Sequence, residues 1–192
     1  CRGGDMHYVD QNGDHRIDSK DRVALGSAAP DFFGGFYTQF KYKGFALGAE
    51  FSYSKGNMAY NAVRNQLEGM NTLGNQSIAV LNRWSLDGQV TDMPRVQHND
   101  PYRSTSFSER WLEDASYLRM KSVTLSYSFN KTVLNFFRSG TLYVSGENLL
   151  TATKYLGLDP EFSYSYGEMS QGLDYAKMVQ PKSVKFGVNL KF

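Results

Sequence analysis

The end of the chain, residues 181–192, alternates between apolar and polar side chains. One set of alternate positions is apolar: Val184, Phe186, Val188, Leu190 and Phe192. The other set is polar or glycine: Ser183, Lys185, Gly187, Asn189 and Lys191. A period of two is the period of a β-strand with one apolar face. The chain must therefore place that face against a second layer of protein or against lipid.

Four earlier segments carry a similar pattern and predict further strands, at 32–42, 45–54, 117–129 and 141–149. Lys43-Gly44 joins the first two and is a signal for a tight hairpin. The composition agrees, because 13 Tyr, 13 Phe and 18 Gly are typical of many strands joined by glycine-rich turns. The expected fold class is all-β.

Strand length and spacing favour a transmembrane antiparallel β-barrel. A strand of about 11 residues with a rise of ~3.3 Å, tilted by ~40°, covers roughly 28 Å, close to the ~25 Å apolar band of such barrels. Short connections at 43–44 and 130–139 alternate with long ones at 55–116 and 150–180. Barrels of the outer membrane have short periplasmic turns and long extracellular loops. We therefore expect the long connections outside the cell and the C-terminus in the periplasm.

This reading divides the chain into four parts. Residues 1–31 form an extracellular loop, 32–54 a β-hairpin of the barrel, 55–115 a long extracellular loop, and 116–192 the last three strands with the closing strand. The long loop is expected to be partly helical, because Val63, Leu67 and Met70 recur at helical spacing, as do Ile78, Leu81 and the nearby Trp84. Five strands are too few to close a barrel, so we expect a fragment or one piece of a split barrel.

Residues 10–21 resemble a calcium loop of the EF-hand or dockerin kind. Loop positions 1, 3, 5, 7, 9 and 12 are occupied by Asp10, Asn12, Asp14, Arg16 (through its carbonyl), Asp18 and Asp21. Position 6, which normally requires glycine for a sharp turn, is His15, and position 12 is Asp21 in place of the longer Glu. A bound Ca²⁺ would stiffen the loop; the alternative is a turn rich in Asp and Asn with no ion.

Other functions receive little support from the sequence. The net charge of +2 comes from 21 basic and 19 acidic residues spread along the chain, so no basic block indicates nucleic-acid binding. The single cysteine, Cys1, excludes an internal disulfide and a cysteine zinc cluster. The three histidines are scattered, and no nucleophile motif is present, so we expect no enzyme.

Aromatic residues near the predicted strand ends suggest two roles. Arg110-Trp111 and Tyr117-Leu118-Arg119 are expected to anchor the rim, because Trp and Tyr favour the membrane interface and Arg can reach its polar side. Aromatics in predicted extracellular loops could instead stack on sugars or peptides, namely Tyr102, Tyr155, Tyr164 and Tyr166.

Several strings together resemble the C-terminal end of SusC/RagA-type TonB-dependent transporters. The most specific are Trp-Leu-Glu-Asp-Ala-Ser-Tyr-Leu-Arg at 111–119 and Gly-Leu-Asp-Pro-Glu at 157–161. Supporting strings occur in the same order at 5–14, 26–35 and 146–151. The resemblance covers nearly the whole chain.

The resemblance implies a 22-stranded outer-membrane barrel with an N-terminal plug, in a Gram-negative bacterium of Bacteroidota type. It also implies import of oligosaccharides or peptides, driven through the TonB complex, with a SusD-like surface lipoprotein as a lid. Phe192 resembles the C-terminal aromatic that serves as an assembly signal. The alternative function is a soluble, calcium-stabilised, β-rich carbohydrate-binding or adhesion module.

Overall fold

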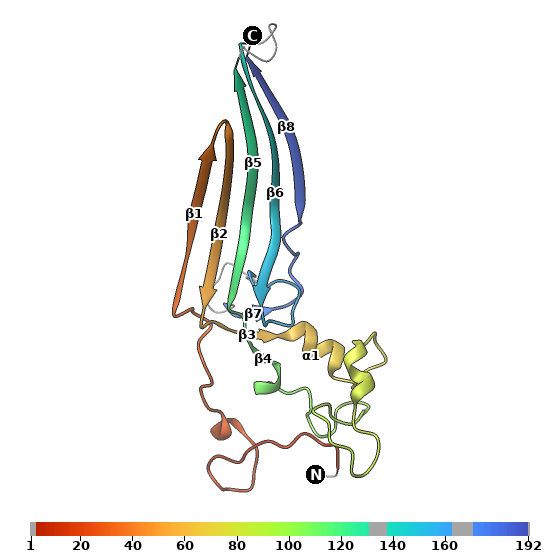
Figure 1. The fold of residues 1–192 in the computed structure, drawn as a ribbon. Coiled ribbons are helices and arrows are strands. Elements are labelled where there is room, and N and C mark those ends of the chain that lie inside the picture. Colours follow the sequence, from red (N-terminus) through yellow and green to blue (C-terminus); the bar gives the residue numbers. More distant parts are fainter. Residues whose placement is uncertain (1–2, 131–137, 163–170, 192) are drawn as a thin grey trace. The chain divides into compact units, whose positions relative to one another are not determined.

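The computed structural model describes residues 3–130, 138–162 and 171–191 (Figure 1). The chain forms two compact units. The loop unit comprises 1–28, 59–113 and 163–177, and the sheet unit comprises 29–58, 114–162 and 178–192.

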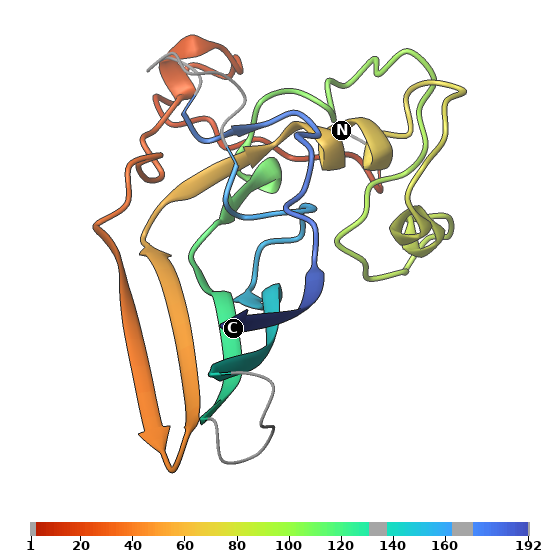
Figure 2. The same cartoon turned by 90° about the horizontal axis from the view of Figure 1, so that it is seen from above.

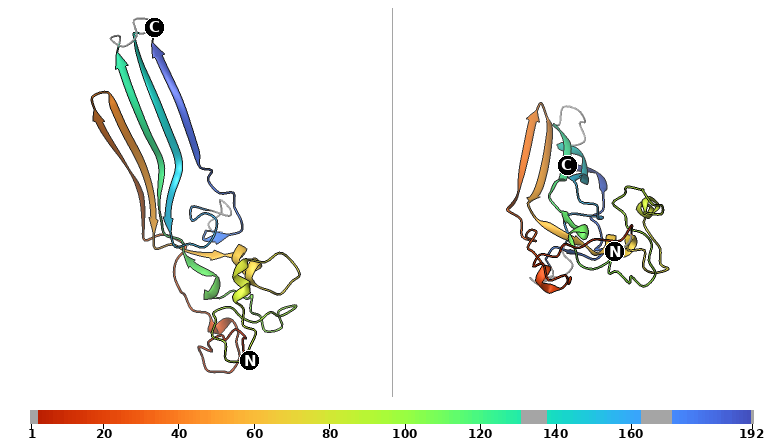
Figure 3. Two further views of the ribbon diagram at one scale, coloured as in Figure 1. Left: turned by 45° about the vertical axis from the view of Figure 1, so that its right-hand side comes forward. Right: turned by 90° about the horizontal axis from the view of Figure 1, so that it is seen from below.

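The sheet unit is a five-stranded antiparallel sheet in the order β1-β2-β5-β6-β8 (Figures 1 and 3). Its strands are β1 (Phe32–Tyr42), β2 (Phe45–Lys55), β5 (Tyr117–Asn130), β6 (Ser139–Thr153) and β8 (Ser183–Lys191). All five lie where the alternating patterns predict strands. β6 is longer than the predicted 141–149, because its ladder with β5 runs from Asn130↔Ser139 to Tyr117↔Thr153.

The turn between β1 and β2 is the tight hairpin that Lys43-Gly44 predicts (Figure 2). Both residues have positive φ, 43° for Lys43 and 87° for Gly44. This backbone matches the twist of paired strands, and glycine adopts it without a steric penalty. A side chain at Gly44 would also bring Cβ to 2.7 Å from the carbonyl oxygen of Ser128. Two separate constraints therefore select glycine at this position.

The register places the apolar side chains on one face of the sheet. Pairs such as Phe36↔Phe51, Leu125↔Val144 and Val144↔Phe186 lie opposite one another on neighbouring strands, and paired residues share a face. Many of these side chains are exposed, with Phe36 at 51% and Phe186 at 81%. The opposite face carries mostly polar residues and glycine, including the Thr124–Ser145 hydrogen bond of 2.9 Å.

A β-bulge interrupts this alternation in β5. Glu50 pairs with Ser122 and Phe51 with Met120, so Lys121 has no partner on β2. On the other side of β5, the ladder with β6 shifts at the same place. A bulge lets two consecutive residues leave the strict alternation and re-aims one side chain. The bulge switches the residues of β5 that face the apolar side, from Leu118 and Met120 before it to Val123 and Leu125 after it.

The loop unit contains a small sheet and several short helices. Its three strands are β3 (Met58–Asn61), β4 (Leu112–Asp114) and β7 (Leu173–Asp174), in the order β4-β3-β7. The helices are α1 (Ala62–Glu68) and the 3-10 turns η1 (Ser19–Asp21), η2 (Ile78–Asn82) and η3 (Glu109–Trp111). The helical spacing predicted α1 and η2, although Met70 and Trp84 lie beyond their ends.

Local capping and a charge network hold α1 in place. Asn61 caps its N-terminus by accepting a 2.9 Å hydrogen bond from the backbone N–H of Arg64. The Arg64 guanidinium donates to Glu68 at 2.9 Å and to Glu113 at 3.0 Å. A small apolar core of Met70, Val80 and Met93 lies in the same unit. No helix in the described residues is both long and apolar enough to cross a membrane.

Candidate functional site

A buried polar site of the sheet unit surrounds Arg119, near the start of β5. Its side chain is 3% exposed. Nε donates to Thr151 Oγ1 at 3.1 Å, Nη1 to Glu161 Oε2 at 3.0 Å, and Nη2 to Asp159 Oδ1. A buried guanidinium is tolerated only when its donors are paired, and here three acceptors from two segments supply those partners. We call Arg119, Lys121, Thr151, Asp159 and Glu161 the arginine cluster.

Lys121, the extra residue of the bulge, also belongs to this cluster. Lys121 Nζ lies 2.7 Å from Glu161 Oε1 and 2.6 Å from Oε2, so Glu161 bridges Lys121 and Arg119. The bulge keeps Ser122 on the polar face that also carries Arg119, because Ser122 pairs with Glu50 and Arg119 with Ser52. The cluster thus fastens the segment after β6 onto β5.

Asp159 also binds the segment that leads into β8. Its Oδ1 accepts from the backbone N–H of Glu161 at 2.9 Å, and its Oδ2 accepts from the backbone N–H of Gln180 at 3.1 Å. Burial by itself raises the pKa of this carboxyl. The hydrogen bond from Arg119 and the two backbone donors outweigh burial, so the net pKa is lower than that of an ordinary Asp. Asp159 is therefore a buried carboxylate at neutral pH.

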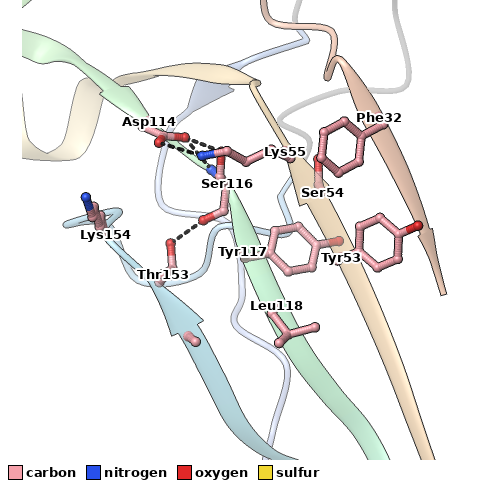
Figure 4. A pocket seen from close by; sticks show the side chains of 11 residues that line it. Phe32, Tyr53, Ser54, Lys55, Asp114, Ser116, Tyr117, Leu118, Thr153 and Lys154 are labelled. Carbon is pink, nitrogen blue, oxygen red and sulfur yellow. Dashed lines mark hydrogen bonds and ion pairs between the residues drawn. The ribbon is translucent and has the colours of Figure 1, made fainter. Parts of the chain in front are cut away.

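A pocket of about 540 Å³ lies at the same end of the sheet (Figure 4). Aromatic, aliphatic and charged side chains line it together, among them Phe32, Tyr53, Leu118, Lys55 and Lys154. The remaining lining residues are Ser54, Asp114, Ser116, Tyr117, Ala152 and Thr153. The pocket thus combines an apolar wall with two ammonium groups.

Asp114 organises the charged side of this pocket. It accepts from the hydroxyl of Ser116 and, at 2.9 Å, from the backbone N–H of Ser116, and its Oδ2 lies 3.8 Å from Lys55 Nζ. The hydrogen bond from the Ser116 hydroxyl is the main reason that the pKa of Asp114 is lower than usual. Thr153 donates at 2.8 Å to the Ser116 carbonyl, so β6 also fixes this turn.

The predicted calcium loop forms a series of turns closed by side-chain oxygens. Asp10 accepts from the backbone N–H groups of Gly13 and His15, both at 2.7 Å, and Asp21 accepts from those of Gln11 and Asp18. The bond from the Asp18 N–H is the main cause of a lowered pKa at Asp21.

His15 has φ of 62°, so it adopts the left-handed conformation that position 6 of such a loop needs. Asn12 and Asp14 accept from the N–H groups of Asp14 and Arg16, and Asp18 accepts from that of Lys20. Across the described ranges, no three His, Cys, Asp or Glu side chains come together as a metal-binding group.

The rim-anchor prediction is wrong for Trp111 and Arg119. Trp111 is 1% exposed inside the loop unit, with the Arg64 and Arg110 guanidinium groups 5.6 and 5.1 Å from its ring centre. This burial leaves no surface of Trp111 for a membrane interface. Arg119 does not extend towards a polar boundary, because the acidic partners that compensate its burial come from the chain itself.

The loop tyrosines that were predicted to stack on a ligand differ in their exposure. Tyr155 is 5% exposed and its ring stacks on Phe162 with 5.5 Å between centroids, so it is a packing residue and not a stacking surface. Tyr102 is 43% exposed, with Arg95 over its ring. Tyr164, Tyr166 and the predicted assembly signal Phe192 lie outside the described residues.

The arginine cluster was not predicted from the sequence. The strings 111–119 and 157–161 both carry the family resemblance, but the local pattern indicated an interface anchor at Arg119. The sequence does contain a signal for this cluster. An Arg within a strand needs a carboxylate partner if its side chain is buried. Asp159 and Glu161 are acidic residues to which the sequence pattern assigned no role. Only the tertiary structure brings these segments together.

Comparison with known proteins identifies relatives over nearly the whole chain. It is 32% identical over 197 residues to TonB-dependent receptor P3 of Formosa agariphila, covering 99% of the chain and 19% of that receptor. It is 26% identical over 188 residues to the TonB-dependent receptor SusC of Bacteroides thetaiotaomicron, covering 96% of the chain and 17% of SusC. The chain thus spans about a fifth of the length of these relatives. No family model matches.

Solved structures agree. The RagAB peptide importer in its open-open state matches with a TM-score of 0.75 and 28% identity, over 96% of this chain and 20% of the matched chain. The closed-closed state of the same importer matches with a TM-score of 0.71 and 27% identity, over 93% of this chain and 20% of the matched chain. These relatives are receptors and importers rather than enzymes, in agreement with the expectation that the chain is no enzyme. The chain is a β-barrel segment that belongs to the SusC/RagA family of TonB-dependent receptors.

Proposed function

We propose that this chain forms part of the barrel wall and outer mouth of an outer-membrane transporter that imports oligosaccharides or peptides. The observation that carries the proposal is the two-faced sheet. Strands β1 and β2 each have 11 residues, enough to cross the apolar band of an outer membrane when tilted. One face of the sheet is exposed and apolar, and the other is mainly polar.

The exposed apolar face supports a location of the sheet in a membrane and not in water. Large side chains on this face are well exposed, including Phe40 at 68%, Phe186 at 81% and Val188 at 58%. A soluble protein rarely leaves such a continuous apolar surface uncovered. The soluble carbohydrate-binding alternative would need a second layer over the face. Lipid provides that cover in a transporter.

The proposed partners follow from what the sheet lacks. Within the described part of the chain, β1 and β8 are the sheet's two edge strands, each paired on one side. An unpaired strand edge needs a neighbour in a membrane, so we propose that the rest of the barrel supplies it. The other proposed partners in the transporter are a plug, the TonB complex and a SusD-like surface lipoprotein. In this arrangement the long loops face the cell exterior and the C-terminus faces the periplasm.

Growth and uptake test the proposal in the intact transporter. Deleting the gene that encodes this chain should abolish growth on, and uptake of, one class of oligosaccharide or peptide. Mass spectrometry of the native complex should identify the bound substrate and a co-purifying lipoprotein. Unchanged uptake of every glycan and peptide supplied, with no lipoprotein in the purified complex, would sink the proposal.

We further propose that Ca²⁺ binds the loop at 10–21. The backbone turns and the left-handed His15 support this idea, and binding would require Asp10, Asn12, Asp14, Asp18 and Asp21 to turn their oxygens inward, with the Arg16 carbonyl as a further ligand. A bound ion would order the loop without catalysing a reaction.

Calorimetric titration of the purified transporter with Ca²⁺ tests this. We expect binding that the D10N/D14N double variant weakens at least tenfold, since two charged ligands are lost. The exposed D87N variant lies outside the loop and serves as the control. Identical titrations for wild type and D10N/D14N would leave only an ion-free turn.

A further inference from the structure

The pocket at the strand ends joins the exposed apolar face of the sheet. The lining residues Phe32, Tyr53, Leu118 and Ala152 all lie on the apolar side of the sheet. Leu118 pairs with both Tyr53 and Ala152, and Phe32 lies two residues before Gly34, which also pairs with Tyr53. Phe32 and Tyr53 form an edge-on aromatic contact with 6.1 Å between centroids. Phe32 is 57% exposed and Leu118 45%. Leu150, which precedes Ala152 on this face, is 66% exposed. The pocket wall is therefore continuous with a surface suited to acyl chains.

Two lysines lie where this apolar wall ends. Lys55 is the last residue of β2 and pairs with Phe32, while Lys154 directly follows the end of β6. Both line the pocket, and Figure 4 shows them flanking Asp114. Aromatic rings and lysines at the edge of an apolar band are characteristic of the interface between acyl chains and headgroups.

The ammonium groups keep their hydrogen-bonding capacity. Lys55 Nζ lies 3.8 Å from Asp114 Oδ2, which is an ion pair but too long for a hydrogen bond. Asp114 itself is engaged by two donors of Ser116. Among the described residues, neither Lys55 nor Lys154 donates a side-chain hydrogen bond. Two cations face one carboxylate, which leaves the pocket with a net positive charge.

We propose that this pocket holds the phosphate headgroup of an outer-leaflet lipid, with its acyl chains against Phe32, Leu118 and Leu150. Lys55 and Lys154 bind the phosphate as point charges, and the aromatic wall receives the glycerol or sugar backbone. The charge and the apolar wall together select an anionic amphiphile over a neutral lipid or a free anion. The inference rests on the proposed membrane orientation, in which this sheet end is the outer one.

The test uses the full-length transporter in detergent and measures lipid binding by native mass spectrometry. The probes are a phosphatidic acid and a diacylglycerol with the same acyl chains. We expect tighter binding of the phosphatidic acid, and a K55Q/K154Q variant that binds it roughly 25-fold more weakly, since each lysine near a headgroup contributes about fivefold. The charge-matched control K41Q/K182Q lies outside the pocket and should bind like wild type. A K55R/K154R variant keeps both charges and should retain binding.

Several results would overturn the site. These are equal binding of the two lipids, wild-type binding by K55Q/K154Q, loss of binding in K55R/K154R, or displacement of the lipid by millimolar inorganic phosphate, which would indicate a free-anion site. Substrate uptake by the wild-type transporter separates this inference from the proposed function. Normal uptake without preference for the phosphatidic acid removes only the lipid site, whereas lipid binding in a protein that imports no substrate removes only the transport proposal.

Discussion

The guanidinium of Arg119 links three parts of the sheet unit that are distant in sequence. It lies on β5 and donates to Thr151 on β6 and to Asp159 and Glu161 in the segment beyond β6. A lysine could not replace it, because a single ammonium cannot present donors in a fork to three acceptors at once. Its burial makes the pairing strict, since a buried charge without a partner is strongly destabilising.

Removing this guanidinium should therefore destabilise the protein. We expect R119Q to lower the free energy of unfolding by about 3 kcal/mol, because Asp159 remains buried without its main partner. Thermal unfolding in detergent, followed by circular dichroism, measures the effect. The exposed R22Q variant removes the same group from the surface and should unfold like wild type. Matching curves for R119Q and R22Q would contradict a structural role for the cluster.

The lowered pKa of Asp159 predicts a pH dependence. The pKa of an Asp in an unfolded chain is about 3.9, and the pKa of Asp159 in the folded chain is lower than that. Its charge therefore contributes stability that is fully present above about pH 4–5 and is lost as the pH falls through the folded pKa.

We expect D159N to be less stable than wild type by about 3 kcal/mol at pH 7. This difference should shrink as the pH falls through the folded pKa of Asp159, where the wild-type carboxyl also becomes neutral. Melting temperatures across this range measure the difference. A difference that stays constant with pH would assign the effect to packing and not to charge.

At the scale of single elements, turns and bulges set the register that brings these residues together. The Lys43-Gly44 turn fixes the pairing of β1 with β2, and the bulge at Lys121 shifts β5 relative to β2 and β6. A second glycine position shows the same control: a Cβ at Gly187 on β8 would lie 2.1 Å from the ring of Tyr143 on β6. Glycine makes room there for an aromatic ring across the strands.

Gly44 and Gly88 form a matched pair for measuring steric control in the hairpin. Their φ angles are 87° and 86°, so alanine suffers the same backbone strain at both, about 1 kcal/mol. At Gly88 nothing lies within 4 Å of the added Cβ, whereas at Gly44 the Ser128 carbonyl does. We expect G44A to cost about 2–3 kcal/mol and G88A about 1 kcal/mol. Equal losses in chemical denaturation would mean that the hairpin shifts to relieve the contact.

At the scale of the whole molecule, the division between an apolar and a polar sheet face decides which solvent each face meets. Neighbouring residues of β8 meet opposite environments: Val188 pairs with Leu142 on the apolar face, and Asn189 pairs with Thr141 on the polar face. Val188 is 58% exposed and Asn189 is exposed as well, so neither side chain is enclosed by a second sheet layer.

Arginine at these two positions should have opposite effects. V188R places a charge on the proposed lipid face, which costs roughly 2 kcal/mol or more near the bilayer centre, while N189R remains on the polar face and costs little. We expect V188R to reduce the amount of folded transporter in the outer membrane and N189R to leave it near wild type. Membrane fractionation and heat-modifiability on gels measure both. Equal membrane levels would favour a water-exposed sheet.

The sequence by itself determined the five strands, the Lys43-Gly44 hairpin and the assignment of side chains to faces, because period-two alternation and turn chemistry are local properties. It also located α1 and η2 through helical spacing. The sequence pattern did not predict the full length of β6, since the ends of this strand depend on its hydrogen-bonded ladder with β5. Only the tertiary structure decided that Trp111 is buried, that Tyr155 packs on Phe162, and that Arg119 meets Asp159 and Glu161. Those outcomes depend on contacts between residues far apart in the sequence, such as Arg64 with Trp111, or Arg119 with Glu161, which lies 42 positions further on; local patterning carries no information about them.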